Sequence, residues 1–135
     1  MFTAVFFGSW FAYVAITFAL GFVWHLVVFK NLYHRLAIYT RLDDPIIPLG
    51  LLSMLIQGAV LAYLYPKVVD IHGSVFEGIT FSLLMRLFLA SSAVIAEVAK
   101  QRVTSLRIWF VVESLYYLIQ FLLTGLAMRS IYSTL

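Results

Sequence analysis

Two charged side chains, Arg86 and Glu113, interrupt stretches of the sequence that are otherwise apolar. A charge at bilayer depth is costly and usually faces protein or a water-filled cavity, so each residue is a candidate functional group. An arginine can attract an anion there, and a glutamate can bind and release a proton. Because an extended arginine side chain can bridge the difference in their depths, we predict that Arg86 and Glu113 form an ion pair if their helices are neighbours. Otherwise Arg86 reaches Gln57 or a bound anion, and Glu113 reaches His25 or cytoplasmic water.

Other polar and small residues recur at helical spacing in the same apolar stretches, which places each set on one helix face. The sets are Ser9, Tyr13, Thr17, Gly21 and His25; Gly50, Ser53 and Gln57; Ser82, Arg86, Ala90, Ala93 and Glu97; and Glu113, Tyr117, Gln120 and Thr124. If the four faces converge, they form a polar interior in the bundle. We predict an intramembrane polar cluster of His25, Gln57, Arg86, Glu113, Tyr117 and Gln120.

Three interpretations of this cluster remain open. Its charges can neutralise each other and hold two helices together, it can bind or conduct an ion or a polar solute, or its polar face can meet another subunit. The sequence alone does not choose among them.

No residue pattern indicates catalysis, a cofactor or a metal. His25 alone is a weak ligand signal, because a haem or a diiron site needs several His or Glu residues at set spacings. Asp70, His72 and Glu77 could bind a metal loosely, but such residues are ordinary in a solvated loop. The chain has no cysteine and no phosphate loop, nucleophile elbow or zinc-protease motif. We therefore predict no catalytic, cofactor-binding or metal-binding residues.

The composition indicates that these residues lie on membrane-spanning helices. The chain is 64% hydrophobic and 11% charged, whereas an ordinary soluble domain is about 25% charged. We predict an all-α integral membrane four-helix bundle with short loops and no soluble domain, as one transmembrane domain over residues 1–135. A membrane-spanning helix needs about 20 residues, and the uncharged stretches predict spans at about 5–29, 46–65, 78–97 and 108–128.

The basic residues predict the orientation of these spans. Loops 30–44 and 98–107 carry Lys30, Arg35, Arg41, Lys100, Arg102 and Arg107, whereas the opposite side has Lys67 and Arg129. The positive-inside rule therefore places both loops in the cytoplasm and both termini outside. A net charge of +3, scattered in this way, argues against nucleic-acid binding.

The first loop has a helical pattern of its own, with Leu32, Leu36 and Tyr39 on one side and basic residues around them. It is either a short interfacial helix on an anionic leaflet or a frayed end of the first span with ordinary topogenic charges.

Several short runs resemble a family of small four-helix bacterial membrane proteins of uncharacterised function. These are Leu-Gly-Phe-Val-Trp-His at 20–25, Phe-Lys-Asn-Leu-Tyr at 29–33, Pro-Leu-Gly at 48–50 and Gln-Gly at 57–58. The resemblance covers mainly the first two spans. It implies a four-helix bundle and carries no site residue.

Two classes of function fit these features, and a membrane enzyme is a third possibility that a cofactor bound beside His25 would favour. The first is a non-catalytic accessory or interaction subunit of a larger membrane complex, because the loops are minimal and no chemistry motif is present. Its partners are the lipid bilayer and other membrane subunits or a second copy of the chain. The second is a small homo-oligomeric transporter or channel that uses Arg86, Glu113 and His25 in a polar interior.

Overall fold

The computed structural model of the chain describes residues 3–134, and none of these forms a strand. The elements are α1 (Ala4–Val23), the π-helical turn η1 (Trp24–Val28), α2 (Lys30–Leu36), α3 (Ile47–Val68), α4 (Val75–Ala90), the π-helical segment η2 (Ser91–Ala96), α5 (Glu97–Ala99) and α6 (Leu106–Thr134). The chain is all-α, as predicted, and four of its helical stretches are long and apolar enough to cross a membrane.

Local signals explain where several helices begin and end. The Thr3 hydroxyl accepts a hydrogen bond from the Phe6 amide at 3.3 Å and caps the start of α1. Pro48 lies in the first turn of α3, where its missing N–H costs no hydrogen bond. Ala37 adopts a left-handed conformation with φ of 59° and ends α2.

The last helix is longer than the predicted 108–128 span. It continues to Thr134 and so includes Arg129. The Arg129 guanidinium donates hydrogen bonds to the carbonyls of Ile71 at 3.4 Å and Gly73 at 2.8 Å, in the loop that joins α3 to α4.

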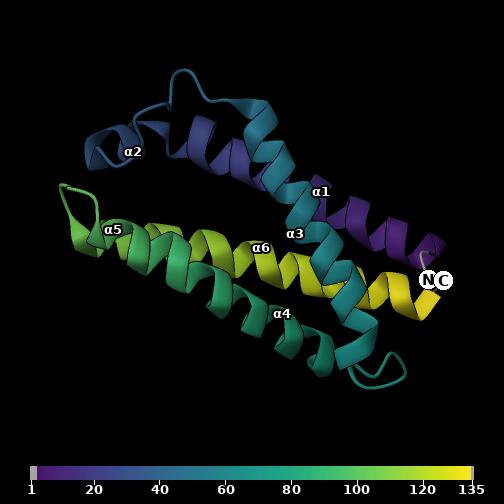
Figure 1. Cartoon of the computed structure of the whole chain (residues 1–135). Helices are drawn as coiled ribbons and strands as arrows, with labels where there is room; N and C mark the ends of the chain where they lie inside the picture. Colours follow the sequence, from purple (N-terminus) through teal and green to yellow (C-terminus); the bar gives the residue numbers. More distant parts are fainter. Residues whose placement is uncertain (1–2, 135) are drawn as a thin grey trace.

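The helices form a bundle in which α1 and α6 lie side by side, with α3 packed on α1 and α4 packed on α6. Contact between α3 and α4 is sparse. Figure 1 shows α2 and α5 at one end, which we call the loop end, and both chain termini at the other, which we call the terminal end. An even number of crossings explains why the termini share an end.

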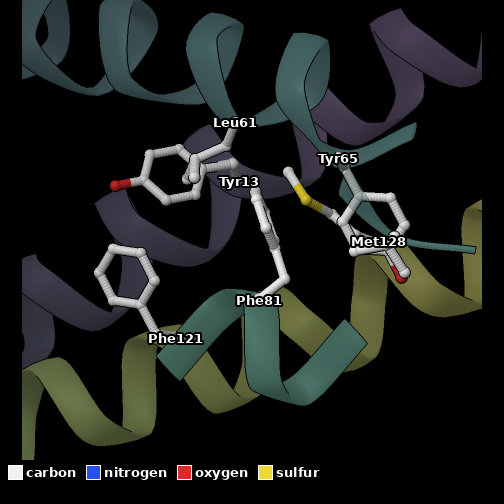
Figure 2. Close-up of a cluster of buried hydrophobic side chains, with 7 residues drawn as sticks. Tyr13, Leu61, Tyr65, Phe81, Phe121 and Met128 are labelled. Atoms are coloured by element: carbon white, nitrogen blue, oxygen red, sulfur yellow. The ribbon is translucent and has the colours of Figure 1, made fainter. Parts of the chain in front are cut away.

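Two hydrophobic clusters hold the bundle together. In the terminal half, Tyr13, Leu61, Tyr65, Phe81, Phe121 and Met128 gather from all four long helices (Figure 2). At the loop end, the second cluster contains Tyr33, Leu36, Ile38, Leu42, Val94, Val98 and Trp109. The first loop is therefore folded into the protein, with Tyr33 and Leu36 of α2 buried. This distinguishes α2 from a frayed end of α1.

The half of α3 nearest the loop end packs against little of the chain. Leu49, Leu52 and Ile56 are 60%, 52% and 58% exposed, and residues 46–53 are all exposed. In Figure 1, this part of α3 diverges from α4 and α6. In a membrane, its outer surface would face lipid or another protein.

Candidate functional site

The most buried acidic group of the described residues is the carboxylate of Glu113, on α6 near the loop end, which is 1% exposed. Its Oε1 lies 2.8 Å from Nε2 of His25 and accepts a hydrogen bond from the Tyr33 hydroxyl at 3.3 Å. Its Oε2 accepts a hydrogen bond from the Tyr39 hydroxyl at 2.8 Å. Three side chains from η1, α2 and the loop that follows α2 thus converge on one carboxylate, which we call the Glu113 site.

The second contact of His25 fixes how many protons the pair holds. Nδ1 of His25 lies 3.1 Å from the carbonyl oxygen of Gly21, which only accepts, so Nδ1 carries a hydrogen. In neutral histidine Nε2 is then a bare acceptor, and a bare acceptor beside an ionised carboxylate at 2.8 Å would be repelled. One further proton must therefore lie between Nε2 and Oε1, either on histidine as an ion pair or on glutamate as a neutral pair.

The two tyrosines act as permanent donors to Glu113. Burial, reinforced by the Glu113 charge, raises the pKa of the Tyr33 hydroxyl and of the Tyr39 hydroxyl well above the ordinary value. Both hydroxyls therefore stay protonated at any physiological pH. Tyr33 in turn accepts a hydrogen bond from the Trp24 indole at 3.0 Å, which leaves its own proton directed at Glu113.

Backbone features that are not visible as sequence motifs position these donors. His25 lies in the π-helical turn η1, an irregularity that often marks functional sites because it redirects side chains. The loop from 100 to 105 also secures α2: the Thr104 amide donates to the Leu36 carbonyl at 3.1 Å, and its hydroxyl donates to the Arg35 carbonyl at 2.7 Å. These bonds satisfy carbonyls at the end of α2 that would otherwise lack partners.

The predicted polar cluster is divided in the structure. Gln57 and Gln120 belong to a separate network closer to the terminal end. There, the Tyr13 hydroxyl donates to Gln57 Oε1 at 2.7 Å, and Gln120 Nε2 donates to Tyr13 at 3.2 Å and to Thr17 at 2.9 Å. This network joins α1, α3 and α6 through buried hydrogen bonds.

Tyr117 is the predicted residue that lies between the two groups. It packs against both hydrophobic clusters, and its ring lies 5.0 Å from the ring of Tyr116. Tyr116, absent from the predicted cluster, has its ring centre 4.5 Å from that of His25.

The expected ion pair between Arg86 and Glu113 is not formed. Arg86 on α4 donates from Nη2 to the backbone carbonyl of Ser114 at 3.1 Å, and no ion pair joins it to an acidic residue within the described range 3–134. Consecutive residues of a helix point in different directions, so Arg86 reaches the backbone beside Glu113 while the carboxylate turns to His25.

We therefore expect the losses of thermal stability in Arg86→Leu and Glu113→Leu to add in the double variant, because the two side chains share no bond. The apparent melting temperatures of the four proteins, purified in the same detergent, measure this. Recovery of stability in the double variant would instead show that the two charges pair.

Two open grooves adjoin His25 near the loop end. The first, about 300 Å³, lies between α1, α3 and α6. The second, about 610 Å³, lies under the loop from 38 to 46 and reaches Glu97 and Gln101. His25, Tyr39, Ile46 and Gly50 line both grooves, so the half of α3 nearest the loop end forms a wall of each.

Across residues 3–134, no three His, Asp or Glu side chains are grouped so that they could hold a metal ion. In the loop between α3 and α4, Asp70 instead accepts a hydrogen bond from the His72 amide at 3.0 Å.

Comparison of the chain with protein-family models, curated proteins and solved structures returns no match.

Proposed function

We propose that the protein is a small membrane transporter or channel in which the His25–Glu113 pair is the proton-binding site. The observation that carries this proposal is the 2.8 Å contact between Nε2 of His25 and Oε1 of the buried Glu113 carboxylate. A buried carboxylate that can pass a proton to a histidine is the usual component of a membrane proton relay. His25 is 19% exposed and lines the groove at the loop end, so the pair can exchange its proton there.

The interface between α1 and α6 supports this proposal beyond the pair itself. Thr17 and Gln120 continue a series of buried polar side chains towards the terminal end, followed by Ser9 and Thr124. An interface between two apolar helices has no need of so many buried polar groups for packing alone. The series offers hydrogen-bonding groups along the length of the bundle.

Proton flux into liposomes tests this function. We expect the reconstituted protein to carry protons down an imposed pH gradient, and Glu113→Gln, which keeps the shape but not the exchangeable proton, to reduce the flux to that of empty liposomes. Glu77→Gln, in the first turn of α4 at the terminal end, is the matched control and should keep the flux. Equal flux in the Glu113→Gln variant would refute the proposal.

The second candidate is an accessory subunit, and the exposed half of α3 favours it. Leu49, Leu52 and Ile56 offer an apolar face that another membrane helix could cover. A photoreactive amino acid at Leu52 would then crosslink to one defined protein in cells. Crosslinks to lipid alone would exclude the accessory role. If the liposomes show no proton flux and Leu52 crosslinks to one defined protein, the accessory role replaces the transport role.

We also propose that the loop end faces the cytoplasm of a bacterial inner membrane, because loops 30–44 and 98–107 hold most of the basic residues. The resemblance of the first two spans to small bacterial membrane proteins supports the location and gives no biochemical role.

Cysteine labelling tests this orientation without background, because the chain has no cysteine of its own. We expect cysteines at Thr40 and Thr104 to resist a membrane-impermeant thiol reagent on intact cells, and a cysteine at Ser74 to react. The reverse pattern would invert the orientation.

A further inference from the structure

Arg86 places a positive charge near the middle of a helix that is long enough to cross the membrane. It lies one residue from the centre of the 25-residue apolar stretch Val75–Ala99. A hydrocarbon core about 30 Å thick therefore leaves about 15 Å of lipid between Arg86 and either edge of the core. Anionic lipid head groups lie outside that core, so they are too far away to neutralise the charge.

The guanidinium of Arg86 has donors left for a further partner. Arginine carries five N–H groups, and one Nη2 bond to the Ser114 carbonyl at 3.1 Å uses a single donor. Nε is buried and has no hydrogen-bond partner among the described residues. A backbone carbonyl accepts a hydrogen bond but does not cancel a full charge. Because a charge in hydrocarbon is costly, Arg86 calls for a carboxylate at its own depth.

A second copy of this chain cannot supply that carboxylate. Glu113 is 1% exposed, and its oxygens are already bonded by three side chains. The other five acidic residues lie in loops or in helical turns next to loops, near the two ends of the bundle: Asp43, Asp44, Asp70, Glu77 and Glu97. The structure describes all six acids of the chain, so a neighbouring copy would present no accessible acid at the depth of Arg86.

The surface beside Arg86 suits a helix better than a free anion. Leu87 on α4 is 62% exposed, and Leu115 on α6, next to Ser114, is 45% exposed. A free anion moving from water to this depth would lose its hydration and gain one cation in return. A carboxylate on a membrane-spanning helix is instead held at this depth by the apolar residues of its own helix, which can also pack on Leu87 and Leu115.

We propose that the face of α4 and α6 around Arg86 binds a transmembrane helix of a different protein, and that this helix carries an aspartate or glutamate at mid-membrane depth. The acid pairs with Arg86, and apolar residues on either side of it cover Leu87 and Leu115. The inference does not depend on proton transfer at Glu113, and its surface is separate from the exposed half of α3.

Designed peptides test this face directly. The probe is a leucine-rich transmembrane peptide with one aspartate at its centre, and the comparison peptides have leucine or lysine there. Each is reconstituted in liposomes with the full chain carrying a photoreactive amino acid at Leu115. We expect the aspartate peptide to crosslink roughly tenfold more than the leucine peptide, which corresponds to about 1.4 kcal/mol in binding. The lysine peptide should crosslink no more than the leucine peptide.

A photoreactive amino acid at Phe11 is the control position, because Phe11 is 74% exposed and lies on α1, away from Arg86. There the aspartate and leucine peptides should crosslink equally. Arg86→Leu should abolish the preference at Leu115, while Arg86→Lys, which keeps the charge, should keep a preference. The comparison of peptides on the unmodified chain needs no variant to fold.

Three results would overturn the proposal. Equal crosslinking of the aspartate and leucine peptides at Leu115, or a preference that survives Arg86→Leu, would show that Arg86 does not recognise an acid. Abolition of the preference by chloride would assign Arg86 to a free anion. Crosslinks between two copies of the chain at Leu115, not competed away by the aspartate peptide, would assign the face to a homo-oligomer.

Discussion

Glu113→Leu is expected to lower the apparent melting temperature of the detergent-purified protein by roughly 10 °C, because removing one partner of a buried pair costs about 3–5 kcal/mol. The substitution leaves His25, Tyr33 and Tyr39 directed at an apolar side chain, each without the acceptor it now has. Thermal unfolding of membrane proteins is often irreversible, so the comparison is made at one heating rate.

Two further variants separate the pair from general loss of packing. His25→Leu should also destabilise the protein, and the double variant with Glu113→Leu should lose less than the sum of the two single losses. Glu77→Leu, which removes a carboxylate at the terminal end, should have little effect. If Glu113→Leu lowers the melting temperature no more than Glu77→Leu does, the hydrogen bonds to the Glu113 carboxylate do not stabilise the protein.

Gly125→Leu is expected to destabilise the protein by about 3 kcal/mol, since inserting atoms into a close-packed contact forces neighbouring elements apart. A Cβ atom at Gly125 would lie 2.6 Å from the hydroxyl oxygen of Ser82 and 3.3 Å from the backbone carbonyl of Gly78, both on α4. The hydroxyl can rotate away, but the carbonyl cannot, so α4 and α6 must separate. The melting temperature in detergent measures the effect.

Gly50→Leu is the matched control for this helix contact, because a Cβ atom at Gly50 meets open space. It should leave stability unchanged or raise it slightly, since glycine inside a helix costs about 0.5–1 kcal/mol relative to alanine. Equal losses in the two variants would mean that α4 and α6 do not approach as closely as the structure shows.

The helices could be predicted from the sequence because each long uncharged stretch has the length that a membrane crossing requires. The observed helices Ala4–Val28, Ile47–Val68 and Val75–Ala99 cover the predicted spans closely. The helix α6 runs beyond the predicted 108–128 span to Thr134, and the Arg129 guanidinium in this extension bonds to loop carbonyls far away in the sequence. Such a contact depends on tertiary structure and leaves no local signal.

The site was only partly predictable for a related reason. Helical spacing placed His25 and Glu113 on inward faces, which is what their pairing requires. The same spacing could not show that Arg86 bonds to a backbone carbonyl, because the rotation of α4 against α6 is set by close packing such as that at Gly125. Tyr33 and Tyr39 lie in the first loop, and only the folding of α2 into the bundle brings their hydroxyls to Glu113.

The proposed proton-binding site requires that His25 and Glu113 share one proton while Nδ1 of His25 carries its own hydrogen. Nitrogen NMR of the protein labelled with ¹⁵N-histidine in lipid bilayers measures this directly. We predict that the Nδ1 of His25 is protonated at neutral pH, and that Glu113→Gln changes the Nε2 resonance of His25 while leaving those of His34 and His72 unchanged. A His25 spectrum that matches exposed His72 and does not respond to Glu113→Gln would contradict the account.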